Sequence, residues 1–238
     1  MKVHARAGGV ARTGYFTPDF FRFLRDLKRN NNRGWFQRNK DRYETGVRDP
    51  VLRFIVDIAP GIKKLSPYFV ADASPIGGSM MRIYRDIRFS KDKSPYKTAV
   101  GVHFWHAKGK EGATPAFYLR LAPGDSAVGA GIWRPEPRAL KQIRDAIVEE
   151  PEKWERATSG RDFRSTCGMA GESLKRPPRG YNQNHPFIED IKRRDFAVSM
   201  PLQDDHVCGP DFMEVLLERF RVSAPFAKFL TQALGLPF

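Results

Sequence analysis

One short stretch of the sequence, RIYRDIRFSKDKSPYK at residues 82–97, concentrates positive charge, and we call it the basic hairpin. It carries six Lys or Arg residues against two acids, Asp86 and Asp92. Guanidinium groups bind phosphate or carboxylate oxygens in pairs, and ammonium groups add point charge. The pattern therefore favours binding of an anion. The residues expected to contact it are Arg82, Arg85, Arg88, Ser90, Lys91, Lys93, Tyr96 and Lys97, with Lys40 and Lys175 from elsewhere in the chain.

Arg85 is the most informative of these residues. If residues 81–89 form one continuous strand, Arg85 shares a face with four apolar residues, Met81, Ile83, Ile87 and Phe89. A guanidinium on such a face keeps its charge, so it must be paired, bound to an anion or released by a bulge. The sequence leaves open whether the partner is an internal carboxylate or a ligand.

Two other hypotheses use the same stretch. In the first, the protein is an enzyme in which Asp86, Asp92 or His185 is the general acid or base beside the cations. The chain lacks the GxxxxGK[ST], HExxH and GxSxG patterns, so we predict no cofactor. In the second, Arg85, Asp86 and Lys93 form a buried ionic network with a purely structural role.

Several aromatic residues are candidates for stacking on a base, namely Trp35, Trp133 and Tyr181. Tyr181 lies with Lys175 and His185 in LKRPPRGYNQNHP, residues 174–186, which is too rich in Pro, Gly and Asn for regular structure. Cations together with stacking rings suit a nucleotide or a nucleic acid. By contrast, His103 and His106 fall on opposite faces of an expected strand, which argues against a shared metal.

The whole chain of 238 residues is basic, with 41 Lys and Arg against 27 Asp and Glu and a formal net charge of +14. Such a charge attracts nucleic acids, anionic lipids and phosphorylated metabolites alike. The two cysteines, Cys167 and Cys208, are too far apart for a metal-binding or redox CxxC pair, so we expect a cytoplasmic protein without a disulfide framework. No apolar run is long enough for membrane insertion, and nothing indicates an oligomeric state.

The elements that must position these residues follow from the hydrophobic period. Apolar residues recur at helical spacing near residues 18–29, 33–43 and 51–58, alternate between about 68 and 133, return to helical spacing at 137–147, alternate at 196–202 and end in a helix from 212. This order predicts an α+β fold with N-terminal helices, a central antiparallel sheet and C-terminal helices packed on it. We expect one domain over residues 15–238 and a flexible basic tail over residues 1–14.

Six runs of sequence carry a resemblance to a known family: NNRGWFQRNKDRYE, RIYRDIRFSKDKSPYKT, FYLRLAP, GIWRPEPRALKQIRDAI, LKRPPRGYNQNHP and APFAKFLTQAL. In order and spacing they resemble the uncharacterised family known as domain of unknown function 2461, from Phe16 onward. The resemblance implies a single α+β domain whose signature is centred on the basic hairpin. The family has no established activity, substrate or cofactor.

Overall fold

The computed structural model describes residues 14–109 and 113–238. The described chain begins with consecutive helices, where helical spacing predicted them. Asn32 caps the second of them, because its Oδ1 accepts a hydrogen bond of 2.9 Å from the backbone N–H of Trp35. The elements are α1 (Pro18–Arg29), α2 (Arg33–Arg38), α3 (Lys40–Tyr43), the π-helix η1 (Glu44–Arg48) and α4 (Asp49–Leu65).

A six-stranded antiparallel sheet occupies the middle of the described chain, in the order β1-β2-β3-β4-β6-β5. The β2–β3 pair has a clear register, in which Val102 lies opposite Leu119 and His103 opposite Tyr118. The strands are β1 (Phe69–Val70), β2 (Val100–His106), β3 (Ala116–Leu121), β4 (Ser126–Ile132), β5 (Gly168–Ala170) and β6 (Phe196–Leu202).

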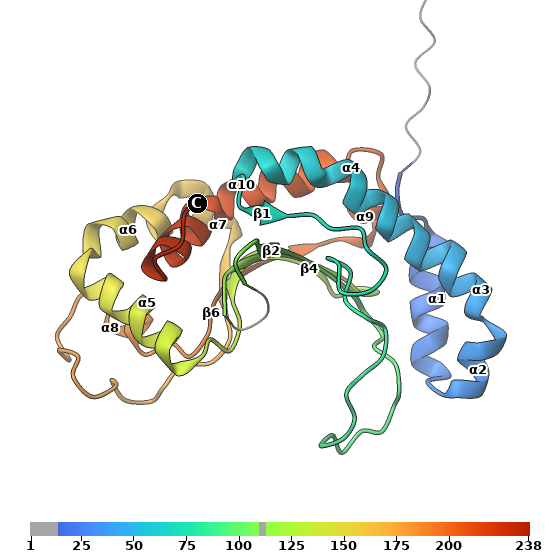
Figure 1. The fold of residues 1–238 in the computed structure, drawn as a ribbon, viewed down its shortest axis with the longest axis horizontal. Helices are drawn as coiled ribbons and strands as arrows, with labels where there is room; N and C mark the ends of the chain where they lie inside the picture. The colour runs from blue at the N-terminus through green and yellow to red at the C-terminus, as the bar shows by residue number, and fades with distance from the viewer. Residues whose placement is uncertain (1–13, 110–112) are drawn as a thin grey trace, which may run out of the picture.

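The remaining helices lie in the C-terminal half of the chain: α5 (Pro137–Glu149), α6 (Pro151–Ser159), α7 (Arg161–Thr166), α8 (Ile188–Ile191), α9 (Asp204–Cys208) and α10 (Phe212–Ala233). Figure 1 shows an arch, with α4 and α10 across the outer face of the sheet, α1–α3 at one end and α5–α8 at the other. The α+β prediction is therefore confirmed in its class and in its order of elements.

The two faces of the sheet differ in what covers them. Phe104 and Phe117 are fully buried on the outer face, where their rings meet that of Phe220 from α10 at centroid distances of 5.9 and 5.0 Å. The alternate residues of β2, His103 and Trp105, point to the inner, concave face and are only half-buried. The hydrophobic core therefore covers the outer face of the sheet and leaves the concave face accessible to a ligand.

Small residues let side chains lie flat on this concave face. A Cβ at Gly129 would come within 2.6 Å of the Tyr118 Oη, so glycine is required for Tyr118 to cross β4. The Tyr118 hydroxyl can then donate a hydrogen bond of 2.9 Å to the carbonyl of Val198 on β6. The Tyr118 side chain consequently lies across β4 and reaches β6.

Two predictions about organisation remain predictions. The expected flexible tail over residues 1–14 lies, apart from Gly14, outside the described residues. The extent of the single domain over residues 15–238 is likewise not settled by the arrangement of elements. Within the described ranges, no helix combines the length and the apolar composition needed to cross a membrane.

Candidate functional site

The basic hairpin leaves the sheet at the concave side, and its two arms hang below the arch in Figure 1. Residues 81–89 do not form the continuous strand on which the interpretation of Arg85 was conditional. The hairpin has one isolated bridge, between Tyr84 and Tyr96, held by hydrogen bonds from Arg85 N to Pro95 O (2.9 Å) and from Lys97 N to Ile83 O (2.7 Å). Turn-forming Ser, Asp and Pro residues interrupt the ladder beyond this bridge.

Residues 81–89 nevertheless alternate between half-buried and exposed positions, as a strand would, except at Phe89. Met81, Ile83, Arg85 and Ile87 are half-buried, whereas the residues between them are exposed. Phe89, which was expected on the half-buried face, is 96% exposed. Arg85 therefore does sit among apolar neighbours, and it requires a partner.

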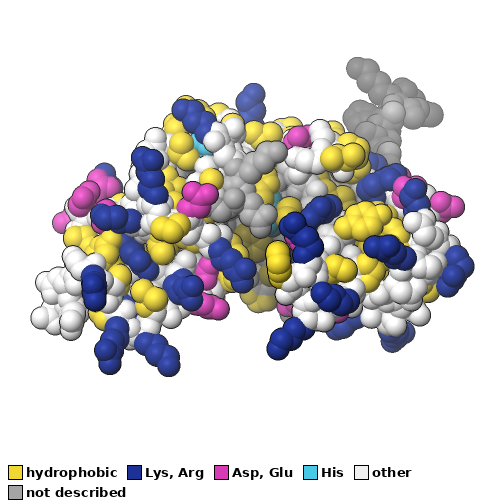
Figure 2. All heavy atoms as spheres, turned by 60° about the horizontal axis from the view of Figure 1, so that its bottom comes forward, with side chains coloured by type: hydrophobic (Ala, Val, Ile, Leu, Met, Phe, Trp, Pro, Cys, Tyr) yellow, Lys and Arg dark blue, Asp and Glu magenta, His cyan; other side chains and the backbone are white. Residues whose placement is uncertain are grey.

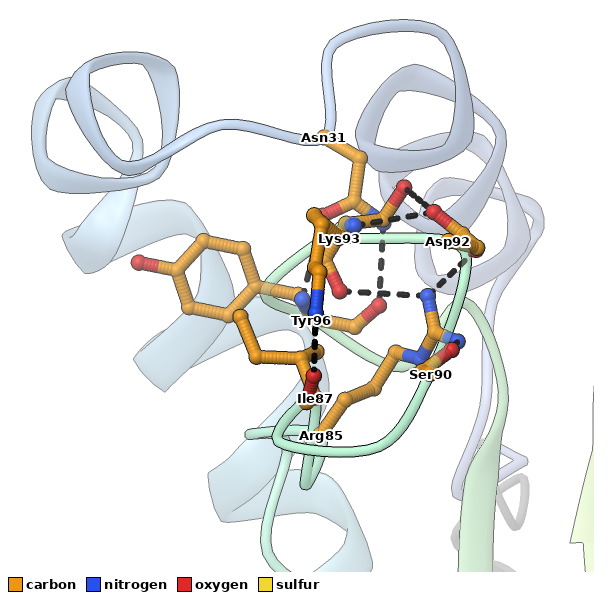
Figure 3. Close-up of polar contacts among 8 residues, drawn as sticks. Asn31, Arg85, Ile87, Ser90, Asp92, Lys93 and Tyr96 are labelled. Atoms are coloured by element: carbon orange, nitrogen blue, oxygen red, sulfur yellow. Dashed lines mark hydrogen bonds and ion pairs between the residues drawn. The ribbon is translucent and has the colours of Figure 1, made fainter.

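That partner lies inside the hairpin (Figure 3). One terminal nitrogen of Arg85 donates to the Asp92 carboxylate and, at 3.1 Å, to the carbonyl of Ser94. The other terminal nitrogen lies 3.3 Å from the Ser90 hydroxyl oxygen. Arg85 thus closes the hairpin upon itself, which answers the question that the sequence left open: an internal carboxylate pairs with it.

The two acids of the hairpin are each held as carboxylates. Hydrogen bonds from the Ser94 hydroxyl (2.6 Å) and backbone N–H (2.9 Å), reinforced by Arg85, lower the pKa of Asp92 to about 2. A two-point contact with the Arg88 guanidinium, at 3.0 and 2.7 Å, lowers the pKa of Asp86 to about 2. A carboxylate with so low a pKa is a weak general base at neutral pH.

The predicted buried network of Arg85, Asp86 and Lys93 is wrong in its members and in its burial. Asp86 pairs with Arg88, and the Lys93 ammonium donates to the carbonyl of Ile87 at 3.1 Å (Figure 3). The Asp92 side chain is 62% exposed. The polar contacts that stabilise the hairpin are therefore partly exposed to solvent.

The hairpin is anchored to the first helices through Tyr96. The side-chain amide of Asn31, between α1 and α2, donates to the Tyr96 carbonyl (2.9 Å) and accepts from its N–H (3.1 Å), as a neighbouring strand would (Figure 3). The Tyr96 ring is 2% exposed and stacks on Phe36 with centroids 4.2 Å apart. Tyr96, predicted to contact an anion, thus has its ring engaged in packing.

A cavity of about 510 Å³ lies between the end of α1, the basic hairpin and the concave face of the sheet. We call it the basic hollow. The one carboxylate among its lining residues belongs to Asp92, which already has partners. Its charged or ionisable lining residues are Lys28, Arg85, Asp92, Lys97, His103 and Arg120.

His103 is the least ordinary residue of the basic hollow. Its Nδ1 is buried and has no hydrogen-bond partner among the described residues. Its Nε2 lies at the wall of the hollow, 3.9 Å from the point that a Cβ added to Gly101 would occupy. Burial, and secondarily the charge of Lys97, lower the pKa of His103 to about 4. The imidazole is therefore neutral at pH 7, and the nearby charge of Lys97 favours this state.

Apart from Tyr96, which also lines this hollow, the other predicted residues do not share it. Arg88, Lys91 and Lys93 are exposed on the hairpin, and Arg82 and Lys40 line a second cavity on its other side. Trp35 is half-buried against Phe23, with ring centroids 5.7 Å apart. The predicted residues are thus divided between several surfaces of this end of the arch.

A further group lies at the opposite end of the arch. The segment 171–187 runs beside α5, away from the hairpin (Figure 1), and the Tyr181 hydroxyl bonds Asp145 of α5 at 2.9 Å. Lys175 and His185 belong to this segment, and the His185 Nδ1 accepts from the backbone N–H of Phe187 at 3.1 Å. Trp133, 51% exposed, follows β4. The structure therefore separates His185 from Asp86 and Asp92.

Sequence reasoning missed Lys28, Asn31 and Arg120, and it considered His103 only as a metal ligand. Arg120 had a usable signal, because it alternates with the buried Leu119 and Leu121 and so had to face the open side of a strand. Lys28 and Asn31 had none, since only the tertiary fold brings the end of α1 to the hairpin. Figure 2 shows Lys and Arg side chains on both sides of the hollowed middle of the molecule.

No metal site accompanies these residues in the part of the chain that the structure describes, since no three His, Cys, Asp or Glu side chains come together. The conserved hypothetical protein family DUF2461 matches residues 19–229. The chain belongs to this family. No curated protein and no solved structure gives a significant match.

Proposed function

We propose that this cytoplasmic protein binds a phosphate-bearing ligand, a nucleotide or a nucleic acid, in the basic hollow. The observation that carries the proposal is the convergence of cations from α1, the hairpin and β3 on one cavity. The lining carboxylate, Asp92, is bound to Ser94 and Arg85 and so competes weakly with an incoming anion. Both cysteines are free thiols, which supports the cytoplasmic location.

The lining residues divide into two roles. Lys28, Lys97 and Arg120 supply attraction for phosphate oxygens at the walls of a partly enclosed space, where charge is screened less than on an open surface. Arg120 is also paired with the exposed Asp125 at 2.9 Å, so phosphate competes there with a surface carboxylate. Arg85 adds charge, but its terminal nitrogens hold the hairpin in place. The neutral His103 offers an imidazole N–H to a phosphate oxygen.

Calorimetric titration with inorganic phosphate at low salt tests the proposal. We expect Arg120→Met and Lys28→Met each to weaken binding by about ten- to a hundredfold, because each removes a charge-assisted hydrogen bond of roughly 1.5–3 kcal/mol. Arg88→Met is the matched control: it removes one positive charge from an exposed side chain outside the hollow and should leave affinity nearly unchanged.

Two results would reject this proposal. An equal loss of affinity in Arg88→Met would mean that phosphate responds to net charge and not to the hollow. Absence of phosphate binding at low salt in the unaltered protein would remove the proposed site altogether.

A structural role for the hairpin is the second candidate, and the internal pairs Arg85–Asp92 and Arg88–Asp86 favour it. These pairs close the hairpin without any ligand. The enzymatic alternative has less support, because Asp86 and Asp92 have pKa values of about 2 and His185 lies in the segment beside α5. An Arg85→Met variant that binds phosphate normally but loses hydrogen-exchange protection in the hairpin would assign Arg85 to structure alone.

A further inference from the structure

A second cavity, of about 550 Å³, lies on the other side of the hairpin, against α2, α3 and η1. We call it the aromatic hollow. Its lining is dominated by rings and aliphatic side chains, in contrast to the cations of the basic hollow. The apolar residues that line it are Phe36, Tyr43, Ile76, Met80, Met81, Ile83, Tyr84 and Trp105.

The two hollows adjoin on the concave face of the sheet. Met81 lines both of them and packs over Gly101, whose Cβ position lies 3.3 Å from the Met81 Cγ. His103, on the basic side, and Trp105, on the aromatic side, are alternate residues of β2, and their rings are in edge contact with centroids 4.7 Å apart. Alternate residues of a strand are spaced by roughly 7 Å, a distance that a sugar phosphate can bridge.

We propose that the aromatic hollow binds the ring of the same ligand whose phosphate occupies the basic hollow, so that the ligand is a small aromatic phosphate of the nucleotide class. This inference rests on the proposed function, and it adds a subsite for the base. Trp105, Tyr84 and Ile76 are its principal contacts. The flexible Met81 side chain lies where the sugar crosses from one hollow to the other.

The exposure of these contacts is what an unfilled ring site requires. Tyr84 is 50% exposed although its ring also touches Phe36 and Tyr96, and Ile76 is 93% exposed at the tip of a turn. For large apolar side chains that line one cavity, contact with an aromatic ring is lower in free energy than contact with water. A ring in this hollow would cover apolar surface that the fold itself leaves open.

Polar groups at the rim give the site hydrogen-bonding capacity for the edge of a base. Lys40, Glu44 and Arg82 line the aromatic hollow. The Glu44 Oε1 accepts from Arg48 at 2.6 Å and lies 4.0 Å from the Lys40 ammonium, so both contacts are on one carboxylate oxygen. Glu44 begins the π-helix η1, an irregular turn of a kind that often occurs at functional sites. The carboxylate accepts and the cations donate, which matches a ring that carries both amino and carbonyl groups.

The experiment compares inorganic phosphate, ribose 5-phosphate, the common nucleoside monophosphates and the corresponding nucleosides by calorimetry. We expect at least one monophosphate to bind tenfold or more tightly than inorganic phosphate and to displace it at a stoichiometry of one. Ribose 5-phosphate should resemble inorganic phosphate, because it lacks the ring. A nucleoside should bind much more weakly than its monophosphate.

Three variants separate the subsites. Tyr84→Ala and Ile76→Ser should weaken the preferred monophosphate about tenfold and leave inorganic phosphate unchanged. Arg120→Met should weaken both. Trp133→Ala is the matched control, since it removes an exposed aromatic ring outside either hollow and should change neither affinity.

Each contrary result has a defined meaning. If phosphate binds but no monophosphate binds more tightly, or if Tyr84→Ala and Ile76→Ser have no effect, the ring subsite is rejected while the proposed function stands. If affinity rises with the length of mixed-sequence oligonucleotides, the ligand is a nucleic acid and the small-ligand assignment is rejected. If neither phosphate nor any monophosphate binds, the proposed function fails as well.

Discussion

At the scale of single residues, the site depends on a contrast between paired and unpaired polar groups. The acids of the basic hairpin are satisfied, Asp86 by Arg88 and Asp92 by Ser94 and Arg85. The imidazole of His103 is the reverse, since its buried Nδ1 has no partner among the described residues. A buried polar atom without a partner is unfavourable for folding, and because Nδ1 is inaccessible, a ligand in the basic hollow would contact the imidazole at Nε2.

We predict that His103 titrates with a pKa of about 4, and that this makes the free energy of unfolding depend on pH. The unfolded chain has an ordinary histidine pKa of about 6.5, so the folded state binds protons less readily. The contribution of His103 to stability is therefore complete above pH 6.5 and declines as the pH falls towards 4. Chemical denaturation across this range, compared with a His103→Gln variant whose slope is reduced, measures the effect.

Ligand binding gives a second readout of the same residue. A phosphate group in the basic hollow adds negative charge next to the imidazole and opposes the effect of Lys97, so it should raise the pKa of His103. Binding between pH 4 and 6.5 should then be accompanied by proton uptake, seen as a dependence of the calorimetric enthalpy on the buffer. An NMR titration that gives His103 a pKa near 6.5 in the free protein would contradict this account.

At the scale of elements, the hairpin is positioned by contacts that a strand would normally supply. Only one bridge joins its arms, so the Asn31 amide and the stack of Tyr96 on Phe36 take over the task of fixing it. This anchoring sets the distance between the cations of the hairpin and those of α1 and β3. The geometry of the basic hollow therefore depends on Asn31, which acts by fixing the hairpin and does not need to contact the ligand.

We predict that Asn31→Ala lowers the free energy of unfolding by about 1–3 kcal/mol, because it leaves both the N–H and the carbonyl of Tyr96 without their partner. The amides of Arg85 and Lys97 should also exchange faster with deuterium, since the hairpin loses its attachment to the helices. The control is Asn184→Ala, on an exposed loop, which should change stability by no more than about 0.5 kcal/mol. Unchanged exchange of the hairpin amides in Asn31→Ala would show that Phe36 alone holds the hairpin.

The sequence predicts these elements unevenly, for physical reasons. Helices and sheet strands follow from the hydrophobic period, because a long amphipathic segment such as α1 must bury its apolar stripe whatever lies opposite. The arm 81–89 keeps the same period-two burial but does not form a strand, since few of its backbone groups find a strand partner. The sequence predicts that Arg85 requires a partner but does not identify it as Asp92. Lys28 and Arg120 line the same hollow only because tertiary contacts bring α1 and β3 together.

At the scale of the whole molecule, the long helix α10 contacts both halves of the arch. At its start, the ring of Phe212 packs on Phe16, just before α1, with centroids 5.6 Å apart. Near the middle of α10, the ring of Phe220 packs on Phe104 and Phe117 on the outer face of the sheet, opposite the concave face that carries the hairpin. Further along, Phe226 and Phe229 pack on Trp154 of α6, with ring centroids 5.8 and 5.0 Å apart. One buried helix thus ties the sheet that lines the basic hollow to the C-terminal helices (Figure 1).

We predict that Phe220→Ala destabilises the protein by about 3–5 kcal/mol, the usual result of removing a buried aromatic ring. Because α10 joins both ends of the arch, both should still unfold together in one transition. Far-ultraviolet circular dichroism and tryptophan fluorescence should then give coincident curves, since they follow the helices and the environments of the four tryptophans respectively. Val56→Ala, at a 59% exposed position of α4, is the control and should shift stability by no more than about 0.5 kcal/mol. Two separate transitions in Phe220→Ala would mean that the ends of the arch are independent units, and that the sheet beside the basic hollow does not rely on the C-terminal helices.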